Sequence, residues 1–394
     1  MININLYNNN FDYLILNKNE IDKLDLDYQS ELLIYNTKKY KIIHNRKKEK
    51  IDLGQIELKT DYINVICLSS ISNYNVNINN WVDAYADTEF NIYFIINEVP
   101  ERQIFFPNDE IEDLRLINKI SKTKNIKVLH HLINLNNKNF IFCPKLLFYG
   151  MINHIPTSIV YDYFYKYFPT IKKEYRIGYH INRLYDGIRI DILNSLIESN
   201  ITTNEKIFCT INENQKKSQY YNKNYEKFLV KNNMMHLHGN LVERNEWYLC
   251  NLFDLSAKSD IELIYETNGL ITIDDFYKNL TEKSIKPIML GKPVIYIDYN
   301  THNFIKSFGF KTYDILLSDS LDKMYNSSNL DYPNSTDWRN KNLYPKIVET
   351  VECILKMNET DYNSLLNECK LIAEYNKNLF HKIMYEETIV NLLN

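Results

Sequence analysis

Short apolar runs, each followed by a segment with helical spacing, recur along this chain and limit what it can fold into. The stretch "DYINVICLSS" at residues 61–70 is apolar over its middle, as strands buried on both faces of a parallel sheet are. A second apolar run follows at 90–100, and helical spacing follows at 111–122. Strands that alternate with helices predict βαβ units, so we expect an α/β fold.

The first 60 residues carry a different pattern, in which polar and apolar residues alternate. We interpret "DYLIL", "ELLIYN", "KYKIIH" and "QIELK" as short strands joined by turns. Residues 1–165 are therefore expected to form one α/β domain with extra N-terminal strands in front. The pattern changes around 156–175, where an aromatic-rich helix, Pro169 and a basic turn predict a domain boundary.

The same alternation begins again after this boundary. The strand "YRIGYHI" precedes an amphipathic helix at 188–199, and the strands "KIFCTI", "DIELIYET" and "KPVIYID" follow. From about Asp322 onward the spacing is helical. Residues 166–394 are therefore expected to form a second domain with a C-terminal helical tail, which gives two Rossmann-like domains in tandem.

Composition excludes several classes of protein. The net charge of −4 argues against a protein built mainly to neutralise nucleic-acid phosphates. The six cysteines form no CxxC pair, which favours reduced thiols and a cytoplasmic setting. No apolar run reaches the roughly 18 residues of a spanning helix, so we expect no membrane span.

The stretch "TEKSIKPIMLG", residues 281–291, reads as a short capped helix. Thr281 can serve as the N-cap, Glu282 and Lys283 then occupy the first turn, and Gly291 ends the helix. A helix N-terminus favours phosphate, and Lys283 adds a full positive charge there. A carboxylate such as Glu282 can accept two hydrogen bonds from a ribose diol. The pair suits a nucleotide, and the alternative is an ordinary surface helix with adjacent charges.

The segment from Tyr265 to Asp314 resembles the C-terminal half of GT-B nucleotide-sugar glycosyltransferases, most of all the α-1,3-fucosyltransferase group and its viral and phage relatives. The matching residues are Glu266, then Thr281-Glu282-Lys283, then Gly291-Lys292-Pro293-Val294, then Gly309-Phe310-Lys311-Thr312-Tyr313. The interval from Glu266 to Glu282 is longer than in the family pattern.

The resemblance implies a GT-B-like fold with the nucleotide-sugar donor in the C-terminal domain. It implies that Glu282 binds the ribose and Lys283 the diphosphate, with Thr281 and Glu266 in the same donor site. The donors implied are nucleoside-diphosphate sugars, GDP-linked ones among them, and the acceptor is a hydroxyl of a glycan or a protein. No further cofactor is expected.

Two arginines in the loop "NRLYDGIR" are candidates for the leaving diphosphate. Without a metal, Arg and Lys must stabilise the charge that develops on this group. Arg183 is the first choice and Arg189 the second, and the loop resembles the Asn-Arg…Arg loop of the family. Arg189 has the alternative of capping a helix or pairing with Asp186, and Arg244 is a weaker third candidate.

Inverting transfer requires a base for the acceptor hydroxyl, and the resemblance implies a Glu of the N-terminal domain. Glu98 follows an apolar strand and is our candidate, with Glu101 as its competitor and a water-facing strand-end carboxylate as the alternative. No metal site is expected, because His236 and His238 lack an acidic or cysteine partner nearby.

The sequence therefore predicts an inverting, metal-independent glycosyltransferase. Two alternatives stay open: a degenerate transferase fold that acts as a binding or virion-associated protein, and a different nucleotide-dependent enzyme on the same plan. The Asn-, Ile-, Lys- and Tyr-rich composition indicates AT-rich coding DNA. Together with the viral resemblance it fits a large DNA virus, acting in the host cytoplasm or the virion, and a bacterial source also fits.

Overall fold

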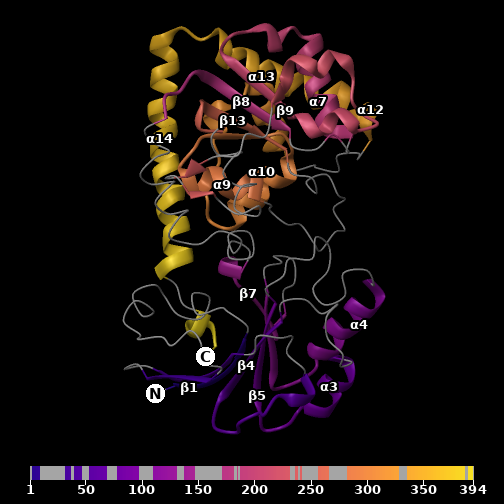
Figure 1. Ribbon diagram of the computed structural model, residues 1–394, viewed down its shortest axis with the longest axis vertical. Helices are drawn as coiled ribbons and strands as arrows, with labels where there is room; N and C mark the ends of the chain where they lie inside the picture. The colour runs from indigo at the N-terminus through magenta and orange to yellow at the C-terminus, as the bar shows by residue number, and fades with distance from the viewer. Residues whose placement is uncertain are drawn as a thin grey trace. The chain divides into compact units, whose positions relative to one another are not determined.

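The computed structural model (Figure 1) describes most of the chain. The described residues are 2–8, 32–36, 40–46, 53–68, 78–96, 110–130, 137–146, 171–181, 184, 187–230, 236–237, 240–241, 256–265, 282–327, 335–386 and 389–393. They divide into two compact units, the first within 1–151 and 381–394, the second within 152–274 and 280–380. The predicted boundary between residues 165 and 166 lies outside the described residues and stays a prediction.

The first unit is built on a seven-stranded sheet of order β2-β3-β1-β4-β5-β6-β7. Every neighbouring pair is parallel except β2 and β3, which run antiparallel at one edge. The strands are β1 (Ile2–Asn8), β2 (Leu32–Asn36), β3 (Tyr40–Arg46), β4 (Ile63–Leu68), β5 (Asn91–Ile96), β6 (Ile126–His130) and β7 (Phe140–Phe142). The α/β prediction is confirmed for this unit.

The N-terminal strands belong to this same sheet. β1 lies in its interior between β3 and β4, although the sequence analysis did not single out Ile2–Asn8 as a strand. Ile4 pairs with Ile42 of β3, and Leu6 pairs with Val65 of β4. All four side chains are buried. The N-terminal strands therefore belong to the main sheet, because β1 pairs with β3 along one side and with β4 along the other.

The predicted strand at "QIELK" is wrong. Gln55 ends a short 3₁₀ turn, η1 (Leu53–Gln55), and Ile56–Lys59 join no sheet. Side chains bond this backbone instead: the carbonyl of Glu57 accepts from Asn5 Nδ2 at 2.9 Å and from the Tyr7 hydroxyl at 3.0 Å. Asn64 Oδ1 accepts the N–H of Lys59 at 2.9 Å. Because these side chains satisfy the backbone groups, no strand partner is needed.

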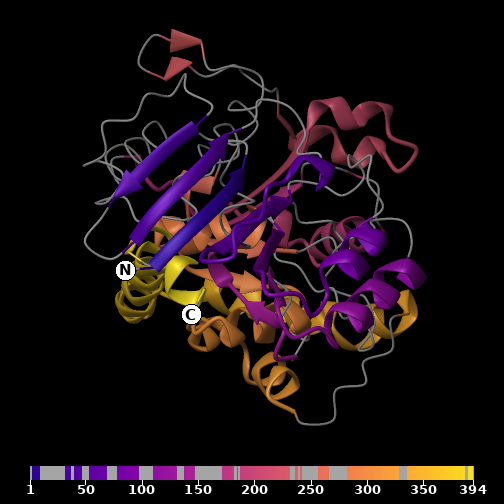
Figure 2. The ribbon, with the colours of Figure 1, turned by 90° about the horizontal axis from the view of Figure 1, so that it is seen from below.

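Two helices, α3 (Ile78–Tyr85) and α4 (Glu110–Ile120), lie together beside this sheet, as Figures 1 and 2 both show. Lys119 of α4 contacts Asp83 of α3 at 2.7 Å. Trp81 of α3 is buried and donates its indole N–H to the carbonyl of Leu53 at 3.1 Å. The helix α4 was predicted and α3 was not. Both bury an apolar stripe against the strands, and together they close the core on this face.

The second unit is built on a five-stranded sheet of order β10-β9-β8-β13-β14, and all of its neighbouring pairs are parallel. A separate antiparallel pair joins β11 and β12. The strands of this unit are β8 (Tyr175–Ile181), β9 (Ile207–Asn212), β10 (Leu229–Val230), β11 (His236–Leu237), β12 (Asn240–Leu241), β13 (Ser259–Ile264) and β14 (Val294–Tyr296). The predicted second α/β domain is thus confirmed as a parallel sheet.

The helices of this unit follow its strands and then form the predicted C-terminal tail (Figure 1). They are α7 (Gly187–Glu198), α9 (Glu282–Leu290), α10 (Tyr299–Ser307), α11 (Asp319–Tyr325), α12 (Thr336–Asn342), α13 (Tyr344–Lys356) and α14 (Glu359–His381). Shorter 3₁₀ turns are η5 (Ile201–Thr203), η6 (Glu213–Lys217), η7 (Lys223–Phe228) and η8 (Asp314–Leu316). In α13, Ile347, Val351 and Ile354 are buried at helical spacing, which fixes that helix to the unit.

A buried lysine supports the amino end of β14. Lys292 is 3% exposed and donates to Ser259 Oγ at 3.0 Å and to the carbonyl of Ser256. Its Nζ lies 3.7 Å from Glu262 of β13. Burial lowers the pKa of Lys292 to about 8, and the Glu262 carboxylate opposes this fall. Lys292 belongs to the segment that carries the family resemblance, and its contacts here are with the protein's own core.

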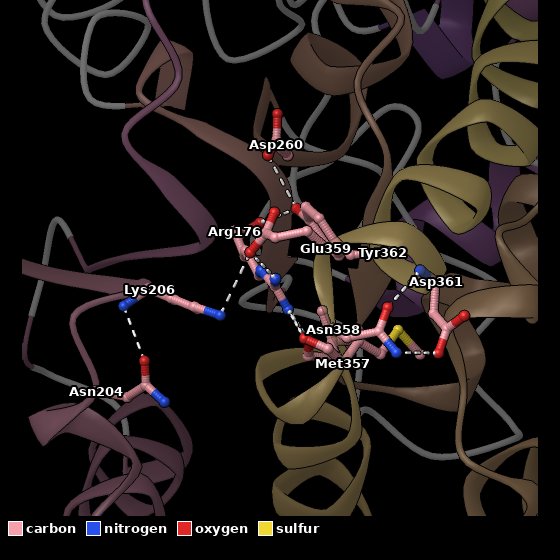
Figure 3. Close-up of polar contacts among 10 residues, drawn as sticks. Arg176, Asn204, Lys206, Asp260, Met357, Asn358, Glu359, Asp361 and Tyr362 are labelled. Carbon is pink, nitrogen blue, oxygen red and sulfur yellow. Dashed lines mark hydrogen bonds and ion pairs between the residues drawn. The ribbon is translucent and has the colours of Figure 1, made fainter.

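Arg176, near the amino end of β8, joins the helical tail to the sheet (Figure 3). Its guanidinium donates to the carbonyl of Ile354 at 2.9 Å and to that of Met357 at 2.8 Å, which satisfies the C-terminal end of α13. The same group pairs with Glu359 at the start of α14, and its Cζ lies 4.1 Å from the ring centroid of Tyr362. One buried side chain thus contacts both α13 and α14.

Two further contacts extend this network. The Tyr362 hydroxyl donates to Asp260 of β13 at 2.9 Å, and Lys206 Nζ lies 3.6 Å from Glu359 (Figure 3). Burial raises the pKa of the Tyr362 hydroxyl, and the Asp260 carboxylate raises it further, so this hydroxyl remains a donor at neutral pH. The tail is therefore bound to two neighbouring strands.

We predict that Arg176→Ala lowers the free energy of unfolding of this unit by about 3 kcal/mol, because it leaves buried helix carbonyls without donors. Arg176→Lys should recover only part of the loss, since an ammonium cannot match the planar guanidinium. Hydrogen exchange followed by mass spectrometry should show faster exchange in α13 and α14. Lys206→Ala, which removes an exposed ion pair to the same Glu359, is the matched control and should change exchange little. Equal exchange in Arg176→Ala and wild type would show that the tail is held elsewhere.

Candidate functional site

The strand order of the second unit contains a topological switch point at β8, where the order of the strands reverses. From β8 the chain passes to β9 on one side, and it later returns as β13 on the other side of β8. After β8 and after β13 the chain therefore continues toward opposite sides of the sheet. In open α/β sheets ligands bind in the crevice outside such a switch point. The sequence-predicted residues Arg183, Arg189, Glu266, Glu282 and Lys283 all follow β8 or β13 in the chain.

Of the two arginines predicted for the leaving diphosphate, Arg189 lies within the described residues. It lies in the first turns of α7 and is 5% exposed. Its Cζ lies 5.9 Å from the ring centroid of Tyr265, which is 3% exposed and directly follows β13. The hydroxyl of Tyr179, on β8, donates to the carbonyl of Arg189 at 3.3 Å. The Arg189 guanidinium therefore lies within cation–π range of the ring that directly follows β13, and its backbone carbonyl is bonded to β8.

The helix α9 has the bounds that the sequence predicted. It begins at Glu282, with Lys283 in the first turn, and ends at Leu290. Gly291 then adopts a φ of +63°, a conformation that favours glycine, and its N–H donates to the carbonyl of Ile288 at 3.1 Å. The buried Ile285 anchors the helix. The start of α9 therefore follows β13 on the chain and carries the Glu-Lys pair in its first turn.

The segment Gly309–Tyr313, which belongs to the family resemblance, is tied to α14. Asn376 of α14 accepts the N–H of Lys311 and donates to the carbonyl of Lys311, each at 2.8 Å. Gly309 has a φ of +86° and ends the turn after α10. The amide of Asn376 thus replaces a strand partner for this segment. Sequence reasoning missed Asn376, because an asparagine within a helical pattern carries no signal of its distant partner.

Asp314, directly after this segment, is the acceptor for three side chains. His302 Nε2 lies 3.0 Å from Asp314 Oδ1, Thr312 Oγ1 donates to Oδ1 at 2.6 Å, and Lys306 Nζ donates to Oδ2 at 3.1 Å. Burial alone would raise the pKa of Asp314, but these donors hold it well below its usual range. The cluster joins α10 to the start of η8. It was not predicted from the sequence.

The predicted site residues divide into two groups. Arg189, Glu282 and Lys283 lie in described helices, and the side-chain positions of the latter two are not described. The others lie outside the described residues, together with the competing Glu101 and Arg244, and they stay predictions: Glu98, Arg183, Glu266 and Thr281.

Among the described residues, no three His, Cys, Asp or Glu side chains gather where they could hold a metal ion. No helix of the described chain is long and apolar enough to cross a membrane.

His130, on β6, is buried, and burial lowers its pKa to about 4, so it is neutral at pH 7.

Comparison with known proteins gives only distant likeness. No protein-family model matches the chain, and no curated protein matches it. Among solved structures, an apo structure of OtsA is similar with a TM-score of 0.40 and 10% identity, covering 100% of this chain and 99% of that chain.

Two further structures are similar to a comparable degree. One, described as trehalose-6-phosphate from E. coli bound with UDP-2-fluoro glucose, has a TM-score of 0.38 and 10% identity over 100% of this chain and 99% of that chain. A trehalose-6-phosphate synthase, OtsA, has a TM-score of 0.36 and 11% identity over 93% and 89%. Similarity this distant assigns neither a family nor an activity, so function rests on the chain's own residues.

We predict that Asp314 makes this protein sensitive to acid. Because its pKa is lower in the folded than in the unfolded state, its stabilisation is present above the unfolded value of about 3.9 and is lost as pH falls below it. Wild type should therefore lose stability relative to Asp314→Asn as pH falls from about 4 toward about 2. Since the carboxylate is partly exposed, the difference should be about 1 kcal/mol.

Urea unfolding curves at several pH values would measure this difference. Thr312→Val removes one of the three donors and should give an intermediate pH dependence. If wild type and Asp314→Asn lose stability in parallel over this pH range, the cluster does not stabilise the charged carboxylate.

Proposed function

We propose that this chain is a glycosyltransferase of the GT-B type that moves a sugar from a nucleoside-diphosphate sugar to a hydroxyl of a glycan or protein. The observation that carries the proposal is the switch point between β8 and β13 in the second unit. Its topology brings the buried Arg189 and Tyr265 together at the carboxyl edge, and α9 with its Glu-Lys pair follows β13. Sequence motif and strand order, which are independent of each other, indicate the same edge.

In this proposal the second unit binds the donor. Glu282 accepts hydrogen bonds from the ribose diol, and Lys283 contacts the diphosphate at the start of α9. Arg183 and Arg189 add positive charge as the diphosphate leaves, and Arg189 does so from a fixed position against Tyr265. Thr281 and Glu266 complete the donor site. A charge that is already in place needs no rearrangement during the reaction, which is the main source of such stabilisation.

The acceptor step belongs to the first unit. Glu98, which follows β5 in the sequence, takes the proton of the acceptor hydroxyl as this oxygen attacks the anomeric carbon and the bond to the diphosphate breaks. Attack from the face opposite the leaving group inverts the configuration. The charge on the diphosphate is stabilised by Lys and Arg alone, so the proposed reaction is metal-independent.

A second function is a binding protein that has kept the transferase fold without its activity. The Glu-Lys pair at the start of α9 favours the enzyme, because a binding module has no need of a group that stabilises a leaving diphosphate. A protein that binds nucleotides but turns over no sugar donor would favour the other nucleotide-dependent enzyme, and a protein that binds no nucleotide would favour the binding module.

We predict that Lys283→Ala abolishes most of the thermal stabilisation given by UDP or GDP. A ligand at 100 times its Kd stabilises a protein by about 2.7 kcal/mol, and loss of a charge-assisted contact should remove about 1.5–3 kcal/mol of binding. Differential scanning fluorimetry measures the shift. Lys323→Ala, at an exposed position of α11, is the matched control and should keep the wild-type shift. A Lys283→Ala shift equal to that of wild type would refute the phosphate role.

We predict that Glu98→Gln retains donor binding but lowers turnover by about 10²–10⁴, because the amide keeps the shape of the side chain but cannot take a proton. Glu101→Gln makes the same charge change three residues further along the chain and should have little effect. Turnover of UDP- and GDP-sugars is measured with a chelator present.

Two results would contradict this scheme. An inactive Glu101→Gln beside a normal Glu98→Gln would move the base to Glu101. Activity that appears only after Mn²⁺ or Mg²⁺ replaces the chelator would refute metal independence.

A further inference from the structure

The backbone of Leu184, which lies in the sequence between β8 and α7, is held by two side chains from the turn that follows the neighbouring strand β9. The N–H of Leu184 donates to Gln215 Oε1 at 2.8 Å, and the Ser218 hydroxyl donates to the carbonyl of Leu184 at 2.7 Å. The backbone N–H and the backbone carbonyl of Leu184 are thus both bonded by side chains rather than by other backbone groups. Leu184 itself is fully buried.

The turn that supplies these two side chains is itself well braced. Gln215 lies in η6, which directly follows β9, and Ser218 is the C-cap of η6. The N–H of Ser218 donates to the carbonyl of Gln215 at 2.9 Å, and Asn212 at the end of β9 caps the start of the turn. Because one hydrogen-bonded turn carries both side chains, Leu184 is held from two directions at a fixed spacing.

The position of Leu184 gives this contact its importance. The held N–H belongs to the planar peptide that joins Arg183 to Leu184, and the held carbonyl belongs to the next peptide, toward α7. Leu184 follows the carboxyl end of β8 by three residues and precedes Arg189 by five in the sequence. A loop that binds phosphate must present its groups in one geometry, since small displacements at a reacting centre are costly.

We propose that Gln215 and Ser218 are positioning residues of the nucleotide site, which act on the bound diphosphate through the backbone of Leu184. The inference rests on the proposed function and names two residues of its donor site that no motif contains. Neither residue needs to touch the ligand. Their role is to hold the backbone of Leu184 in place before the nucleotide arrives.

Ser218→Ala tests the proposal, with the Kd for UDP and GDP measured by isothermal titration calorimetry on the full chain. We expect Kd to rise about tenfold, because the variant loses the hydrogen bond that holds the carbonyl of Leu184 in place. Ser218→Thr keeps the hydroxyl and should restore binding. Ser195→Ala is the matched control, because Ser195 donates to the carbonyl of Asp191 at 2.9 Å within α7, away from this connection. Its Kd should match wild type.

The outcomes separate the inference from the function on which it rests. Wild-type protein that binds neither nucleotide overturns both. Wild-type binding with an unchanged Kd in Ser218→Ala overturns the inference alone, even if the melting temperature falls, because a purely structural role changes stability without changing affinity. If Ser218→Ala does not fold, Gln215→Met removes the other bond with little change of shape, and its unchanged Kd overturns the inference in the same way.

Discussion

The contact of Arg176 with the ends of α13 and α14 is the interaction on which the second unit depends. Arg176 lies near the amino end of β8, the central strand, and its guanidinium satisfies two helix carbonyls and one carboxylate. A charge that is 5% exposed requires such a set of partners, because burial without them would be costly. The tail helices are thereby tied to the strand that also leads, at its opposite end, to the candidate site.

The two ends of β8 serve different purposes for the same physical reason. In a parallel sheet all carboxyl ends lie at one edge, so loops that leave them can form a site, while the amino ends are free to carry structural contacts. At the amino edge Arg176 and the buried Lys292 hold the core together. At the carboxyl edge Tyr265 holds Arg189, and Gln215 with Ser218 holds Leu184. In both places side chains contact backbone groups, hydroxyls or rings, and these contacts fix the positions of the residues that they join.

Local patterns predicted the elements of this fold well where a strand or helix carries its own apolar signal. The strands β4, β5, β8 and β13 and the helices α4, α9, α13 and α14 were recognised from period and capping. The errors came where partners far along the chain decide the outcome. "QIELK" alternates like a strand, but Asn5, Tyr7 and Asn64 bond its backbone. The first strand, Ile2–Asn8, has too many asparagines to read as buried, yet β3 and β4 pair on both of its sides.

The sequence by itself determined the α/β class, those strands and helices that carry their own apolar signal, and the candidate residues from Glu98 to Lys283, because period, capping and motif are local properties. Only the tertiary structure decided the sheet orders and hence the switch point between β8 and β13. It also decided the partners of Arg189 and Leu184, which pair with Tyr265 and with Gln215, the latter 31 residues away in sequence. Strand order follows from which apolar faces and ladder edges bury one another across the whole unit, and no local pattern contains that choice.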